Sequence, residues 1–130
     1  MNNCIHTTVA TVTKLNEDLL CVEYHQDVYV DIAQLAEARE AYRKLMGEKK
    51  FYLLTVINSG VTHSLDARKE WLKKKRSTFK LAEAFVIDNL PHRMIANFVM
   101  RVTPPPHKMN YFANEYRALE WLLKQKARKN

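Results

Sequence analysis

Residues 51–57 have the sequence FYLLTVI, a continuous apolar run between Lys49-Lys50 and Asn58-Ser59-Gly60. A short apolar run without polar alternation is typical of a strand that is buried on both faces, as strands are in the middle of a parallel sheet. Residues 84–88 (AFVID) have the same character. Together the two runs predict a sheet that is covered by helices on both sides.

An amphipathic helix is predicted between residues 32 and 46, just ahead of the central strand, because apolar residues recur there at helical spacing. Asp31 is suited to cap the first turn, and Gln34, three residues later, completes a capping box. Gly47 then supplies a helix stop.

Three further helices are predicted from their capping residues and their apolar faces. They are a helix over 65–76 capped by Ser64, a helix over 91–102 with Pro91 in its first turn, and a C-terminal helix capped by Asn114.

The remaining strands are predicted at residues 5–14, 19–25 and 108–112. The first two are separated by a short polar turn and therefore predict an antiparallel hairpin. The element order β-β-α-β-α-β-α-β-α predicts an α/β fold, with one domain over residues 1–130 and a mixed five-stranded sheet flanked by four helices.

Composition narrows the class of protein. Only two glycines occur in 130 residues, which argues against a turn-rich all-β fold and against a glycine-rich phosphate loop. Cys4 and Cys21 are far apart and lack a CxxC partner, so reduced thiols are expected rather than a disulfide. No signal peptide and no long apolar span is apparent, so we expect a cytoplasmic protein without a membrane span.

The net charge of +7 is concentrated in two basic runs, Lys73–Arg76 and Lys124–Lys129. The favoured interpretation is that both are solvated helix ends, where lysine and arginine oppose the negative end of the helix dipole. The alternative is a basic surface that binds nucleic acid or other polyanions. Trp71 and Trp121 are expected to pack helices on the sheet, because stacking on bases would need aromatic residues interleaved with the basic ones.

A sequence pattern in the second half of the chain resembles a known family. Asn97-Phe98, the proline-bearing segment 104–106, Tyr111-Phe112 and the run Ala118–Leu122 form the pattern N-F … P … F … A-x-x-W-L. This pattern is similar to that of small bacterial SpoIIAA-like proteins of unknown function, which share the STAS fold. The resemblance implies a SpoIIAA/STAS-like fold and a non-enzymatic regulatory domain that binds a protein partner.

In the STAS family, a serine in the turn after a central strand is phosphorylated, and this turn, which opens the following helix, docks the partner kinase. The matching stretch here is residues 58–64, which lacks the Asp-Ser-(Ser)-Gly signature of that turn. This turn is nevertheless the candidate for partner or anion contact, since ligands of open α/β sheets bind beyond the carboxyl ends of the strands. The favoured interpretation is an ordinary turn with a helix cap, and contact is the alternative. The candidate residues are Ser59, Thr62, His63, Ser64 and Asp66.

The sequence contains no complete catalytic motif. His63, Ser64 and Asp66 are close in sequence, but catalytic triads are assembled from residues that are distant in sequence, so this closeness does not indicate one. The five histidines show no short ligand spacing, so neither a metal site nor a cofactor is predicted. Arg93, Asn97 and Arg101 are candidates for a cleft, with a structural hydrogen bond as the favoured role for Asn97. Pairing of an exposed edge strand would give a homodimer, which the sequence leaves open.

Overall fold

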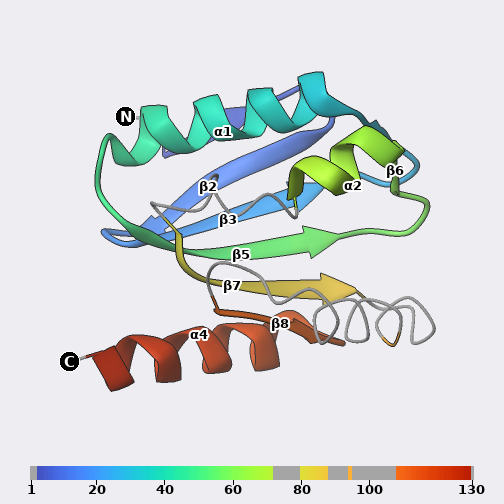
Figure 1. Cartoon of the computed structure of the whole chain (residues 1–130). Coiled ribbons are helices and arrows are strands. Elements are labelled where there is room, and N and C mark those ends of the chain that lie inside the picture. Colours follow the sequence, from blue (N-terminus) through green and yellow to red (C-terminus); the bar gives the residue numbers. More distant parts are fainter. Residues whose placement is uncertain (1–2, 72–79, 88–93, 95–107, 130) are drawn as a thin grey trace.

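Six strands form one mixed sheet, with helices on both of its faces (Figure 1). The computed structural model describes residues 3–71, 80–87, 94 and 108–129. The strands are β1 (Cys4–His6), β2 (Ala10–Asn16), β3 (Leu19–Tyr24), β5 (Phe51–Ile57), β7 (Lys80–Ile87) and β8 (Lys108–Phe112). Their order in the sheet is β1-β2-β3-β5-β7-β8. β2 is antiparallel to β1 and β3, whereas β3, β5, β7 and β8 run parallel to one another.

The apolar run at 51–57 is the central strand that its sequence predicts. β5 lies between β3 and β7, and its residues from Phe51 to Val56 are all buried. Its side chains alternate between two hydrophobic clusters, so that Leu53 belongs to one and Leu54 to the other. A strand inside a parallel sheet needs this double burial, and the continuous apolar sequence supplies it.

One face of the sheet is covered by α1 (Ile32–Met46), which begins and ends as its sequence predicts. The Asp31 backbone N–H donates to Gln34 Oε1 at 2.8 Å, which is one half of the capping box. Gly47 ends the helix with φ 64°, and its N–H donates to Arg43 O at 2.8 Å. Leu35, Ala38, Tyr42 and Met46 form its buried side.

The opposite face is covered by α4 (Glu115–Lys129), which lies over β5, β7 and β8 (Figure 1). Asn114 caps it as predicted, because its side-chain Oδ1 accepts from the Arg117 N–H at 2.9 Å. Ala118 and Leu122 are buried, and the Trp121 ring lies 5.8 Å from that of Phe112. Trp121 is therefore a packing residue between helix and sheet.

A small parallel ladder lies beyond the main sheet. It pairs β4 (Tyr29–Val30) with β6 (Thr62–His63), and α2 (Leu65–Trp71) follows directly. The predicted helix over 65–76 begins at the expected residue. Its continuation past residue 71 and the predicted helix over 91–102, except Met94, lie outside the described residues.

The prediction of a single strand over residues 5–14 is wrong. The Thr7 backbone N–H donates to Ala10 O at 2.8 Å, and the Thr7 hydroxyl accepts from the Ala10 N–H at 3.0 Å. Threonine bonds to nearby backbone in this way and so competes with the ladder, which turns the chain back on itself. β1 and β2 consequently pair with each other, and the sheet has six strands instead of five.

β7 begins four residues before the predicted strand at 84–88. Two of its first four residues, Lys80 and Glu83, are charged, yet Glu83 is 2% exposed. The Glu83 carboxylate accepts from the Thr55 hydroxyl at 2.9 Å and lies 3.4 Å from Lys80 Nζ. Partners supplied by β5 and by β7 itself make the burial of this charge tolerable, and sequence periodicity does not reveal them.

Both cysteines are free, as expected. Cys4 and Cys21 each pair with Thr13 from opposite sides, so β2 separates them. Two inter-strand spacings amount to about 10 Å, which exceeds the roughly 7 Å limit for a disulfide. Burial raises the pKa of Cys21 to about 11 and keeps it a thiol. Among the described residues, no helix is long and apolar enough to cross a bilayer.

Candidate functional site

The site is built where two parallel strands end. β3 and β5 run in the same direction, so the segments that follow them leave the sheet at one edge, the carboxyl-terminal edge (Figure 1). The Thr62 N–H donates to Val28 O at 3.0 Å, and the Ser64 N–H donates to Val30 O at 2.9 Å. This ladder holds the first residues of α1 and α2 close together.

A hydrogen bond between Asp31 and Ser64 joins the two helix starts. The Ser64 hydroxyl donates to Asp31 Oδ1 at 2.6 Å, and the same oxygen accepts from the Ile32 N–H at 2.8 Å. Ser64 Oγ also accepts from the Ala67 N–H at 3.0 Å, which makes it the cap of α2. The Ser64 hydroxyl, with a smaller contribution from the Ile32 N–H, lowers the pKa of Asp31.

The turn before Ser64 is fixed by backbone contacts. The Asp27 N–H donates to Ser59 O at 3.0 Å, and Asp27 adopts a φ of 61°. Gly60 has a φ of 78°, and a Cβ placed on it would overlap the Asp27 carboxylate. Asn58 Nδ2 donates to Tyr24 O at 2.8 Å and to a Glu23 carboxylate oxygen at 3.1 Å. Residues 58–60 are thus tied to the end of β3.

His63 points into the protein rather than into solvent. Its ring is half-buried and meets the Tyr24 ring edge-on at 6.4 Å. Burial, followed by the positive charge of Arg68, lowers the pKa of His63 from 6.5 to about 4. The imidazole is therefore neutral near pH 7.

The five residues predicted for partner or anion contact do fall in one short segment, but they differ in accessibility. Ser59, Thr62 and Asp66 are exposed, whereas His63 and Ser64 are partly buried. The single hydroxyl proton of Ser64 goes to Asp31, so this serine is not activated by His63. The other three candidates, Arg93, Asn97 and Arg101, lie outside the described residues.

Three large apolar residues within two positions of Asp31 or Ser64 in the sequence are exposed. Tyr29 is 58% exposed, Ile32 is 43% exposed and Leu65 is 66% exposed. Ile32 follows Asp31 directly, Leu65 follows Ser64 directly, and Tyr29 pairs with Thr62 in the ladder. We call these three residues the apolar rim.

Sequence reasoning found the turn and missed the rest of this surface. Asp31 was identified as a helix cap, but its bond to Ser64, 33 residues away, depends on the two-residue ladder. Tyr29 and Ile32 were not predicted as surface residues of a site. The sequence signal that indicates an exposed apolar residue here is the isoleucine at position 32, which directly follows the capping residue Asp31.

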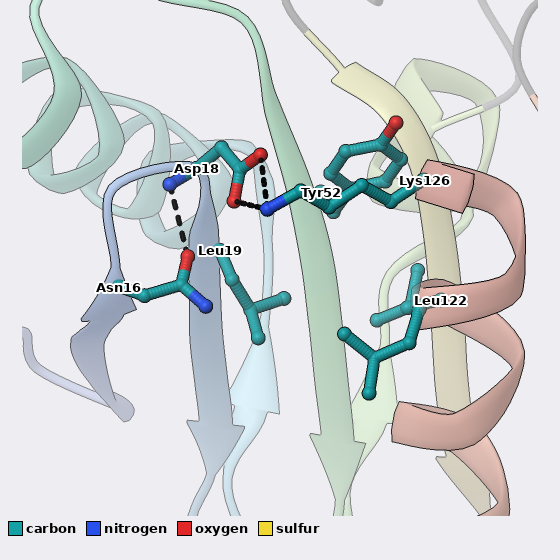
Figure 2. Close-up of a pocket in the computed structure, with 7 residues that line it drawn as sticks. Asn16, Asp18, Leu19, Tyr52, Leu122 and Lys126 are labelled. Carbon is teal, nitrogen blue, oxygen red and sulfur yellow. Dashed lines mark hydrogen bonds and ion pairs between the residues drawn. The ribbon is translucent and has the colours of Figure 1, made fainter. Parts of the chain in front are cut away.

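A shallow depression lies at the opposite, amino-terminal edge of the sheet, where β3 and β5 begin (Figure 2). Lys126 of α4 pairs with the Asp18 carboxylate at 3.1 Å, and the Tyr52 N–H donates to Asp18 O at 2.7 Å. Burial, and then the Asp18 charge, raise the pKa of Tyr52. The depression has room for about one water molecule, too little for a metabolite. It is lined by Asn16, Asp18, Leu19, Tyr52, Leu122, Leu123 and Lys126.

The described residues contain no cluster of potential metal ligands. Across residues 3–71, 80–87, 94 and 108–129, no three His, Cys, Asp or Glu side chains are close enough to share an ion.

The sequence matches the model of one protein family. Residues 13–126 match a family described as a domain of unknown function, DUF7793. The chain belongs to this family. No curated protein matches the sequence significantly.

The fold has a counterpart among solved structures. The chain is similar to an uncharacterised protein of the DUF3478 family with a SpoIIAA-like fold, from Shewanella loihica PV-4. The TM-score is 0.59 at 16% sequence identity, and the match covers 94% of this chain and 98% of the other. This likeness confirms the SpoIIAA-like α/β fold predicted from the sequence, and at this identity it concerns the fold alone.

Proposed function

We propose that this DUF7793 domain is a non-enzymatic interaction module that binds a regulatory protein partner through its carboxyl-terminal edge. The supporting observation is the apolar rim, whose three large apolar side chains are 43% to 66% exposed and belong to residues next to or two positions from the hydrogen-bonded Asp31 and Ser64. An apolar surface with a few oriented polar groups at its middle is typical of a protein interface.

The polar centre favours a specific partner over a nonspecific one. Ser64 and Asp31 are held in one geometry by four hydrogen bonds that also start two helices. Residues 58–60 are anchored to β3, so the exposed Ser59 has little freedom. A preorganised surface loses little entropy on binding.

The test is affinity capture from a lysate of the source organism, followed by direct binding to the purified candidate. Leu65→Ser and Ser64→Asp are the informative variants, because the first removes apolar area and the second places a second carboxylate beside Asp31. Leu123→Ser is the matched control, since Leu123 is 51% exposed on α4 at the other edge.

A partner that is retained by the wild type and by Leu123→Ser, and lost by both other variants, supports the proposal. Circular dichroism must show that Leu65→Ser and Ser64→Asp remain folded. Capture of the same proteins by all three variants contradicts the assignment of the interface to the carboxyl-terminal edge.

A further inference from the structure

Much of the positive charge of the described residues gathers at the amino-terminal edge of the sheet, where β3, β5, β7 and β8 begin. Three segments meet there: the β2–β3 connection with its flank (14–18), the end of α1 with the loop to β5 (43–51) and the last turns of α4 (123–128) (Figure 1). They contain eight basic and three acidic residues. The other described residues contain seven basic and ten acidic ones, so the excess of positive charge in the described part of the chain lies in these three segments.

Helix dipoles explain only part of this charge. Lys44, Lys124 and Lys126 lie in the last turns of α1 and α4, where a cation is favourable. Lys49 and Lys50 lie beyond the end of α1, and both are exposed at the surface. Ion pairs with Asp18 and Glu40 offset the charges of Lys126 and Arg43, whereas Lys44, Lys49 and Lys50 are exposed to solvent at this edge.

Two exposed leucines lie among these charges. Leu15 is the extra residue of a β-bulge, because Lys14 pairs with Leu20 and Asn16 with Leu19. The bulge turns its side chain out of the ladder, and it is 49% exposed. Leu123 is 51% exposed and borders the same depression as Asn16, so it lies close to the bulge.

We propose that the amino-terminal edge docks on an anionic lipid surface. Lysines around exposed leucines suit a bilayer interface, where the cations meet acidic headgroups and the leucines enter the acyl boundary. Nucleic acid is the less suitable polyanion, because the aromatic residues described at this edge, Tyr42, Phe51 and Tyr52, are buried and offer no stacking platform. Charge and apolar side chains therefore favour the membrane.

The experiment measures co-sedimentation of the full chain with vesicles of phosphatidylcholine alone or mixed with phosphatidylglycerol. The wild type is expected to bind only the mixed vesicles, and to bind less as salt is raised. Replacing Lys44, Lys49 and Lys50 together by alanine should weaken binding about 100-fold. Each lysine near an anionic surface contributes about 1 kcal/mol, which is a factor of about 5 in affinity. The control carries the same charge change at the other edge, with alanine at Arg68, Lys69 and Arg117.

Leu123→Ser tests the apolar contribution and should weaken binding about 10-fold, whereas Leu65→Ser should leave it unchanged. Three results would overturn the proposal: absence of binding to the mixed vesicles, equal weakening by both triple variants, or tighter binding to a single-stranded or duplex oligonucleotide than to vesicles. Because partner capture depends on Leu65 and vesicle binding on Leu123, failure of either proposal leaves the other readable.

Discussion

The two edges of the sheet differ in how their surfaces are held. At the carboxyl-terminal edge, hydrogen bonds between Asp31 and Ser64 and between Asn58 and Tyr24 O fix the turn in one geometry. At the amino-terminal edge, exposed lysines and a single cross-element ion pair, Asp18–Lys126, dominate the described residues. Directional bonds define a shape, while exposed charges define only a field. One surface is therefore suited to a specific partner and the other to an extended charged surface.

A substitution at Gly60 should have the largest effect on the difference between the two edges, because it disturbs the fixed turn at the carboxyl-terminal edge. Gly60→Ala should destabilise the protein by about 2 kcal/mol, because an L-residue at φ 78° is strained and its Cβ would meet Asp27. Urea unfolding measures the change. Combining it with Asp27→Gly should recover part of the loss, since the obstructing carboxylate is gone. A double variant whose loss is fully additive would show that Asp27 is not the obstacle.

Acid should loosen the carboxyl-terminal edge through His63. Its folded pKa of about 4 lies below the unfolded value of 6.5, so between these values the unfolded chain binds a proton that the folded chain excludes. The contribution of His63 to the free energy of unfolding is therefore fully present above pH 6.5 and is lost as the pH drops toward 4. The loss is about 2 kcal/mol once the partial exposure of the ring is allowed for. Urea midpoints across this range measure the fall.

His63→Gln is the control for this pH dependence. The variant should show a shallower loss of stability between pH 6.5 and 4, since glutamine does not titrate. Identical slopes for the wild type and the variant would assign the acid sensitivity to other groups.

The smallest effect is expected at the amino-terminal edge. Lys126→Met removes the ion pair with Asp18 and keeps the aliphatic stem, so it should cost about 0.5 kcal/mol, because the two side chains are 44% and 27% exposed. The loss should shrink as salt is added. Lys124→Met makes the same charge change without this pair. A loss at Lys126 that is insensitive to salt would mean that packing, rather than charge, holds α4 to the β2–β3 turn.

Much of the fold was readable from local signals. The apolar run at 51–57 marked the central strand, and Asp31, Gln34, Gly47 and Asn114 marked helix ends. These signals work because capping and double burial restrict the residue types at a position regardless of distant contacts. The family likeness of the second half pointed to the SpoIIAA-like fold, which the solved relative confirms.

The errors arose where specific side-chain hydrogen bonds decide the structure. The break in the strand at 5–14 depends on the local bond between Thr7 and Ala10. The early start of β7 depends on the distant Thr55, whose hydroxyl donates to the buried Glu83 carboxylate. The candidate site was predicted as five residues within the turn at 58–66, but its apolar rim includes Tyr29 and Ile32 from another segment. Sequence periodicity contains no information about such pairs.

The sequence by itself determined the central strand, the ends of α1, the start of α4 and that both faces of the sheet would be covered. It also determined the net charge of +7. Only the tertiary structure decided that Asp31 meets Ser64 and that charges from three separate segments share one edge. The physical reason is that parallel strands bring their starts to one edge and their ends to the other, however far apart those residues lie in the chain.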